Sequence, residues 1–276
     1  MISKIEPFKL KERKKIVRIL FLLILIFETY LYYSNTLLHQ LKKPLLKLLD
    51  LDVTYYVFHF LKIPATIINN SFLSFSFDLI LFILIILIII YPLKRFLIVS
   101  FFILFFTYLI TRNSYGVFHE HLFNGVIFAV FPFIFRSNLT TKYLWEFTRY
   151  IHLFIYSSAF LWKIGRFSFF DSNQLSSIIE LNLTSYMLEN PKTYFTYFYK
   201  SILLHPYFLF LIGLIGLLLE ALFLIGFFTK KYDSYLFFLG IFIHCFFWIF
   251  ADAFYFPILL ISLSLLNFKK ITQIND

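Results

Sequence analysis

A lysine in the middle of the chain is the side chain most suited to acid–base chemistry. Lys163 closes a helix-length apolar run, residues 150–166, and is followed by Gly165 and Arg166. At the edge of a hydrocarbon layer, an amine can extend its stem to water and serve as an anchor. In an apolar cavity, an amine loses its proton more readily and can act as a base. The sequence allows both roles for Lys163, and a helix end with cationic residues and a glycine stop is the plainer interpretation.

Seven further titratable side chains inside apolar runs or at their ends are candidates for a site, because an unpaired charge there is costly. They are His119, Glu120, His121, His152, His205, Glu220 and His244. We expect Glu120 and His121 to act with Lys163 at a catalytic site, where they orient the ligand. The other five are assigned to ligand binding, and Glu220 and His244 are also expected to brace the helices.

These assignments have plainer alternatives. The spacing of His119 and His121 places their rings about 200° apart on a helix, so no metal site is expected there. A polar cap at the membrane interface is the alternative role for that stretch. His152, Glu220 and His244 could instead form hydrogen bonds between neighbouring helices.

The composition is that of a membrane protein. Of the 276 residues, 61% are hydrophobic and only 14% are charged, whereas soluble domains carry about 25% charged residues. The net charge of +10 lies mostly in short loops, where lysine and arginine set membrane topology, so nucleic-acid binding is not expected. The single cysteine, Cys245, excludes an internal disulfide and a thiolate metal cluster.

The apolar runs predict an all-α integral membrane protein with about eight transmembrane helices. The expected spans are residues 16–33, 72–91, 96–111, 117–135, 150–166 and 205–228, a seventh that holds His244, and a short eighth that ends near Phe268. Between the first two spans, residues 37–68 carry leucines at three- and four-residue spacing between lysines and aspartates. This pattern is typical of an amphipathic helix in the membrane interface.

We interpret residues 1–276 as a single polytopic membrane domain. Its segments outside the bundle are a basic N-terminus at 1–15, the interfacial segment at 37–68, a long polar loop at 167–200 and a tail at 269–276. Short basic loops follow alternate spans, and basic short loops stay in the cytoplasm. Both termini are therefore expected to be cytoplasmic, with the 167–200 loop and Lys163 on the outer side, beside an outward-facing cavity.

Four stretches follow one another in an order known from one family. They are FHEHLFNG at 118–125, SSAFLWKIGRF at 157–167, LLLEALFLIGFFTKK at 217–231, and FIHCFFWIF with the following FYFP at 242–257. This order resembles the membrane portion of the vitamin K-dependent gamma-carboxylase family and its bacterial relatives, the HTTM (horizontally transferred transmembrane) domain proteins. The resemblance covers residues 10–268.

The resemblance implies a function for Lys163. In the carboxylases the matching lysine is the proposed base that deprotonates reduced vitamin K, so a reduced quinone is the implied cofactor here. Three departures from the family's pattern matter. The family's usual asparagine–histidine pair is matched only imperfectly by His119 to His121. Phe167 to Phe170 stand where family members usually carry a tryptophan, and no large soluble domain follows the last span. We therefore expect a bacterial inner-membrane protein that binds a quinone-like or lipid-like molecule, and the missing soluble domain weighs against protein carboxylation.

Two other classes of function remain open. A membrane scaffold or accessory subunit would bind a partner membrane or envelope protein through the 167–200 loop. A transporter would carry internal repeats and broken helices, and the sequence has no obvious repeat. In every case the lipid bilayer is an expected partner.

Overall fold

The computed structural model describes residues 6–41, 53–115, 124–167, 173–251 and 255–268. Every regular element in this part of the chain is a helix, which confirms the predicted all-α fold. Five helical stretches are long and apolar enough to cross a membrane, as expected of a multi-pass membrane protein. They are Leu10–Gln40, Ser71–Ile90, Arg95–Ser114, Pro206–Phe228 and Asp233–Phe250, and they match the first, second, third, sixth and seventh predicted spans.

Two of the other predicted spans correspond to short helices. The described part of the fourth consists of α6 (Asn124–Val130) and the 3-10 helix η3 (Phe131–Ile134). The eighth consists of α13 (Phe256–Ser262) and η6 (Leu263–Leu265). By length, these described helices fall short of the roughly 20 residues that a helical crossing needs.

The fifth predicted span lies within a longer helix. α7 (Asn138–Gly165) has 28 residues and starts well before the predicted start at residue 150. It is long enough to cross a membrane but less apolar than the five candidate spans. Several polar side chains on α7 are buried by neighbouring helices, as described below.

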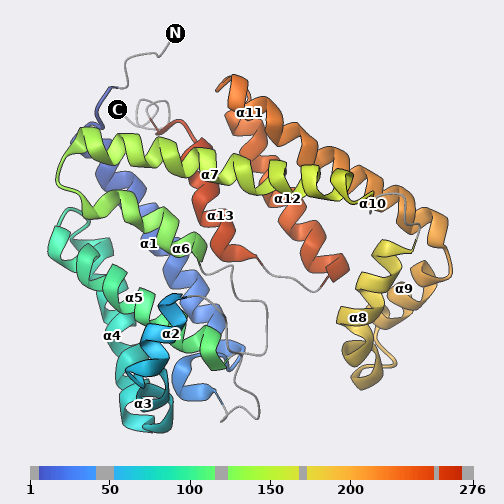
Figure 1. Cartoon of the computed structure of the whole chain (residues 1–276), viewed down its shortest axis with the longest axis horizontal. Coiled ribbons are helices and arrows are strands. Elements are labelled where there is room, and N and C mark those ends of the chain that lie inside the picture. Colours follow the sequence, from blue (N-terminus) through green and yellow to red (C-terminus); the bar gives the residue numbers. More distant parts are fainter. Residues whose placement is uncertain (1–5, 42–52, 116–123, 168–172, 252–254, 269–276) are drawn as a thin grey trace. The chain divides into compact units, whose positions relative to one another are not determined.

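The chain folds as two compact units, each described here by itself. Unit 1 comprises Met1–Thr148, Phe256–Ile261 and Asn267–Asp276. Its long helices are α1 (Leu10–Tyr33), α4 (Ser71–Ile90) and α5 (Arg95–Tyr115) (Figure 1). α4 packs against both α1 and α5. Buried aromatic rings of α1 and α5 also contact one another, with the ring of Phe101 5.0 Å from that of Phe21 and 5.3 Å from that of Phe105.

The described part of the predicted interfacial segment, 37–68, forms three short helices in place of one continuous helix. They are η1 (Leu38–Gln40), α2 (Val53–Phe60) and α3 (Ile63–Asn69). The break between α2 and α3 lies at Lys62, whose φ of 56° is left-handed. Pro64 follows in the first turn of α3, where proline is tolerated because the first amides of a helix have no acceptor within the helix.

An arginine on α1 fixes the connection between η3 and α7. The guanidinium of Arg13 donates to the carbonyl oxygens of Phe133, Phe135 and Arg136 at 3.2, 2.6 and 3.1 Å. It also donates to Oδ1 of Asn138 at 3.0 Å. Arginine has five donors in a planar fork, so one side chain can satisfy several carbonyl groups that the end of a helix leaves without partners.

Unit 2 comprises Arg149–Tyr255 and Ser262–Leu266, and so begins within α7. Its further helices are α8 (Gln174–Glu189), α9 (Tyr194–Leu203), α10 (Pro206–Ala221), η5 (Leu222–Leu224), α11 (Ile225–Phe228) and α12 (Asp233–Ala251). α8 packs against α10 and α12. A buried cluster of Leu153, Tyr156, Phe223, Leu236, Ile243 and Leu265 forms one core of this unit.

Most of the predicted loop at 167–200 is helical. α8 and α9 occupy it and pack against each other (Figure 1). Thr193 caps α9 by accepting a hydrogen bond from the Thr196 amide at 3.3 Å. Ile179, Leu183 and Ile202 are buried in a second apolar cluster between these helices and Leu209 of α10.

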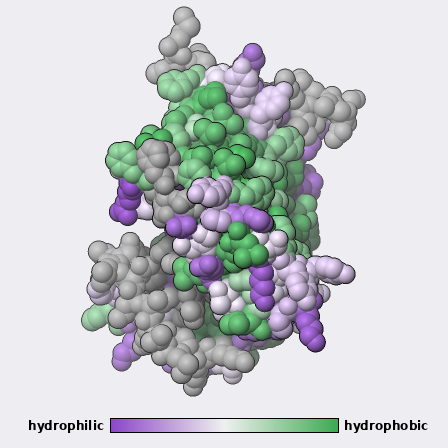
Figure 2. Space-filling view, turned by 90° about the vertical axis from the view of Figure 1, so that its right-hand side faces the viewer, coloured by the Kyte–Doolittle hydropathy of each residue, from purple (hydrophilic) through white to green (hydrophobic). Residues whose placement is uncertain are grey.

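Large hydrophobic side chains cover much of the surface. Phe72 and Phe96 of unit 1 are 74% and 79% exposed, and Leu211 of unit 2 is 56% exposed. Figure 2 shows hydrophobic side chains over broad areas of one face, interrupted by hydrophilic ones. Apolar surface of this extent is typical of a protein that contacts a bilayer or other proteins, in accord with the five candidate spans.

Candidate functional site

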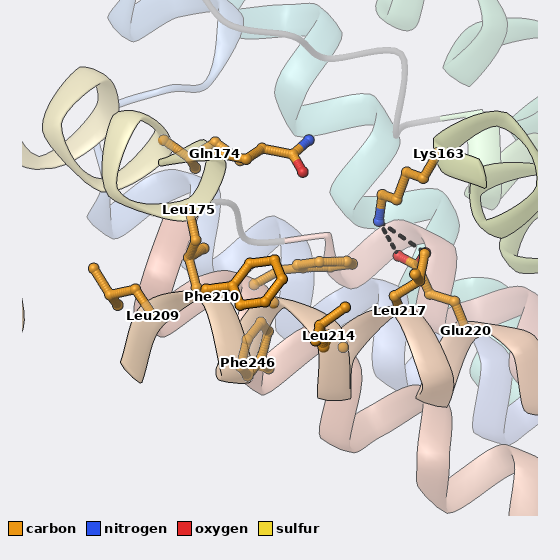
Figure 3. Close-up of a pocket in the computed structure, with 13 residues that line it drawn as sticks. Lys163, Gln174, Leu175, Leu209, Phe210, Leu214, Leu217, Glu220 and Phe246 are labelled. Carbon is orange, nitrogen blue, oxygen red and sulfur yellow. Dashed lines mark hydrogen bonds and ion pairs between the residues drawn. The ribbon is translucent and has the colours of Figure 1, made fainter. Parts of the chain in front are cut away.

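Lys163 forms an ion pair with Glu220. Its Nζ lies 2.6 Å from Oε1 and 2.8 Å from Oε2 of that carboxylate (Figure 3). The Glu220 side chain is only 3% exposed, whereas that of Lys163 is 29% exposed. The pair joins the last turn of α7 to the last turns of α10. Lys163 is therefore not an isolated amine, because a buried carboxylate holds it.

The ion pair lies at an apolar pocket within unit 2. The pocket has a volume of about 100 Å³. It is lined by Lys163, Gln174, Leu175, Ile178, Leu209, Phe210, Gly213, Leu214, Gly216, Leu217, Glu220, Phe246 and Phe247, from α7, α8, α10 and α12. In Figure 3, Leu214, Leu217 and Phe246 line the side of α10 and α12, and Gln174 extends from α8.

Two glycines of α10 contribute to the space in this pocket. A Cβ atom added at Gly213 would have no heavy atom within 4 Å, and one at Gly216 would lie 3.7 Å from the ring of Phe246. Glycine is costly inside a helix. Here the missing side chains leave room for the pocket beside α8 and α12.

His152 is buried without a hydrogen-bond partner among the described residues. Its exposed fraction is 0%, and neither ring nitrogen has a partner in that part of the chain. The ring packs edge-to-face against Tyr156 and Phe223, with centroids 5.0 and 5.6 Å away. Buried polar groups are almost always hydrogen-bonded. The arrangement of His152 therefore needs an explanation beyond packing.

His244 is held by a tyrosine. Nε2 of His244, on α12, lies 2.5 Å from the hydroxyl of Tyr156 on α7. Nδ1 of the same imidazole has no hydrogen-bond partner within the described ranges. This contact links α12 to α7.

The sequence reasoning missed an ion pair between Arg149 and Asp233. Nε and Nη2 of Arg149 lie 2.7 and 2.6 Å from the two carboxylate oxygens of Asp233. Nη2 also donates to the Gly226 carbonyl oxygen at 2.7 Å. Arg149 is only 2% exposed, so it is not part of a basic surface loop. Its spacing from His152, Tyr156 and Lys163 was the available signal, because these positions share one face of a helix.

Unit 1 contains a second group of buried titratable side chains. Asp78 of α4 accepts from the amides of Leu38 and His39 at 3.3 and 3.0 Å, and its Oδ2 lies 2.6 Å from Nδ1 of His39. Glu28 of α1 is 7% exposed and interacts electrostatically with Asp78 and Arg112. Arg112 donates to the Thr36 carbonyl oxygen. Glu28 and Asp78 were visible in the sequence as charges within apolar runs, but their shared location was not.

Of the eight predicted site residues, Lys163 and Glu220 line the pocket and six do not. His152 and His244 lie elsewhere in unit 2, on α7 and α12. His119, Glu120 and His121 lie outside the described residues. His205 is exposed at the start of α10 and is not among the residues that line the pocket. Within the described ranges, no three His, Cys, Asp or Glu side chains form a group that could hold a metal ion.

The chain matches no protein-family profile, no curated protein and no solved structure. The function is therefore argued from the site itself.

Proposed function

We propose that unit 2 binds a quinone-like or lipid-like molecule in the Lys163 pocket, in the manner of an HTTM or vitamin K-dependent carboxylase-like membrane protein. The supporting observation is an ion pair at a pocket whose other lining residues, apart from Gln174, are apolar. Apolar walls with a few placed polar groups suit a ligand with a hydrophobic body and one polar group. Lys163 and Glu220 would contact that polar group, while Leu214 and Phe246 would contact the body.

The size of the pocket limits what it encloses. Its volume of about 100 Å³ is below the roughly 150 Å³ of a cavity that holds benzene. The pocket therefore takes part of a ligand, a ring edge or a short stretch of chain. The rest of the molecule would extend away from the pocket into the surrounding lipid.

The ion pair supports proton transfer from a bound quinol. Lys163 first gives a proton to Glu220, so that the amine and the carboxylic acid are both neutral. The amine then takes a proton from the ligand hydroxyl, leaving the ligand as an anion beside the new ammonium group. Lys163 remains the base of this proposal, and Glu220 is the group that prepares it. The Lys163 amine and the Glu220 carboxylate lie 2.6 Å apart, within the hydrogen-bond distance that general acid–base chemistry requires.

A binding titration tests the proposal. Purified protein in detergent is titrated with a short-chain naphthoquinone, and quenching of tryptophan fluorescence reports binding; Trp162 precedes Lys163 on α7. Leucine at position 213 would fill the pocket without meeting neighbouring atoms at its Cβ. We expect Gly213→Leu to abolish binding and Lys163→Met to weaken it by about tenfold or more.

Gly165→Ala is the matched control, since a Cβ there also meets nothing within 4 Å and Gly165 does not line the pocket. This variant should bind like the wild type. Equal binding by wild type, Gly213→Leu and Lys163→Met would refute the pocket as the ligand site.

A second candidate function is supported by the surface of α9. Tyr194, Phe195 and Tyr197 are 93%, 60% and 60% exposed, and aromatic side chains are enriched where proteins bind one another. We propose, as this second function, that the chain is a scaffold and that the exposed aromatic surface of α9 binds a partner membrane protein. Replacing Tyr194 and Tyr197 with serine would then release the partner in a co-purification experiment, while naphthoquinone binding stays unchanged. Retention of the partner by this double variant would exclude the surface.

A further inference from the structure

The residues that line the pocket of unit 2 carry no net charge between them. Of these residues, Lys163 and Glu220 are the two that hold a charge. The Lys163 amine lies 2.6 and 2.8 Å from the two carboxylate oxygens of Glu220, so one positive charge is balanced by one negative charge. A ligand therefore meets a pocket that is polar at one place but neutral as a whole.

The burial of Glu220 makes this balance costly to disturb. The Glu220 side chain is 3% exposed, so its charge depends on Lys163 more than on water. A buried carboxylate that loses its counter-ion is strongly destabilised. A second anion in the pocket would share the single ammonium group with Glu220, and two negative charges at short distance repel strongly away from water. The ion pair thus disfavours a ligand with a carboxylate or phosphate group.

Gln174 provides the pocket with an uncharged polar group. It is the first residue of α8 and lines the pocket, and in Figure 3 its amide group points toward Lys163. A primary amide has both donor and acceptor atoms, so it can bind a carbonyl or a hydroxyl group without adding charge. The polar groups of the pocket therefore suit a neutral hydrogen-bonding group at the end of an apolar ligand.

We propose that the pocket selects uncharged amphiphiles, whose polar group is a carbonyl or a hydroxyl, over carboxylates and phosphates with the same apolar body. Glu220 determines this selectivity, because its negative charge cancels the attraction of Lys163 for anions. The selectivity rests on the proposed function, since it concerns the ligand of the same pocket. It narrows the quinone-like and lipid-like class to neutral molecules and removes fatty acids and lipid phosphates from it.

A purely structural role of the ion pair makes a different prediction. Ion pairs and hydrogen bonds between helices also hold membrane proteins together, and the Lys163–Glu220 pair joins α7 to α10. If that were its whole role, the charge of Glu220 would have no effect on which ligands bind.

Two probes that share a chain length and differ in charge test the selectivity. Purified protein in detergent is loaded with the short-chain naphthoquinone, and recovery of tryptophan fluorescence reports its displacement by 1-decanol or by decanoate. The two competitors are compared at equal concentrations in the detergent phase, at about pH 8.5, where a carboxylic acid is ionised. We expect decanol to displace the naphthoquinone from the wild type at a concentration at least about tenfold lower than decanoate.

Glu220→Gln tests the cause of the selectivity, because it keeps the shape of the side chain and removes its charge. We expect decanoate to compete at least about tenfold better in this variant than in the wild type, while decanol changes by less than about threefold. Both probes enter the same detergent with either protein, so a change in their ratio reports the pocket. Glu180→Gln is the matched control: it removes an exposed carboxylate of α8 that does not line the pocket, and it should keep the wild-type ratio.

Equal competition by decanol and decanoate in the wild type would overturn the selectivity, and so would the same ratio in the wild type and in Glu220→Gln. The wild-type comparison decides alone if Glu220→Gln does not fold. Naphthoquinone binding to the wild type without a preference for decanol would leave the proposed function standing and remove the charge selectivity alone. A wild type that binds no naphthoquinone would overturn both.

Discussion

The buried ion pair between Arg149 and Asp233 gives the sharpest test of the packing in unit 2. Asp233→Asn keeps the shape of the side chain and removes its charge, so the guanidinium loses its counter-ion in a site where Arg149 is 2% exposed. Removing one partner of a buried pair costs about 3–5 kcal/mol. Asparagine retains one acceptor, and the Gly226 carbonyl oxygen still accepts from Nη2. We therefore expect a loss near 3 kcal/mol.

Reversible unfolding in mixed micelles of mild detergent and SDS, followed by tryptophan fluorescence, measures this loss. The double variant Arg149→Met with Asp233→Leu removes both charges and should recover most of the stability, because an apolar pair can replace a buried ion pair. Glu146→Gln is the control on the same helix; its pair with Lys142, at 3.2 Å, is partly exposed and worth about 0.5 kcal/mol. A decrease of less than about 1 kcal/mol in the free energy of unfolding of Asp233→Asn would refute the claim that Arg149 and Asp233 form an ion pair shielded from water.

Three further substitutions are measured in the same unfolding assay. Gly125→Ala should destabilise unit 1 by about 3 kcal/mol, because the added Cβ would lie 2.1 Å from the Pro257 carbonyl oxygen. Gly165→Ala is the control and should leave the free energy of unfolding unchanged, because its Cβ would enter open space. Equal free energies of unfolding for the two variants would contradict the close packing of Gly125 against Pro257. Asp78→Asn should cost about 2 kcal/mol by weakening its bonds to the η1 turn, and a neutral result would argue against them. Arg13→Lys keeps the charge but loses the planar fork that reaches four acceptors, so it should also cost about 3 kcal/mol. A cost no larger than that of an arginine-to-lysine change at an exposed position would show that these four hydrogen bonds do not stabilise the fold.

The spans could be predicted because their signal is local. Residues 206–228 form a long apolar run, and the structure has a candidate span with these bounds. The helices at 174–203 were harder to predict, since their polar residues suggested a loop. Ile179 and Leu183 are one helical turn apart, and they are buried only because α9 and α10 cover them. Tertiary packing of an amphipathic face decides such helices more than composition does.

The candidate site could be predicted only in part. Lys163 was identified from its place at the end of an apolar run, but its partner Glu220 lies 57 residues further along the chain. Asp233 lies 84 residues from Arg149. Such pairings depend on how helices rotate and pack about one another, and one sequence does not encode that in any local pattern. The repeated spacing of polar residues on α7 was the only local signal, and it identifies a face without naming its partners.

The polarity of α7 bears on how the protein is made. This helix has the length of a membrane crossing but not the hydropathy of one, and its buried arginine and its lysine find their carboxylates on α12 and α10, which the ribosome synthesises later. During synthesis we therefore expect α7 to stay at the insertion machinery, or at the bilayer surface, and to enter the membrane only when those two helices have emerged. A nascent chain halted after residue 203 should leave α7 open to aqueous reagents, and one extended past residue 251 should not.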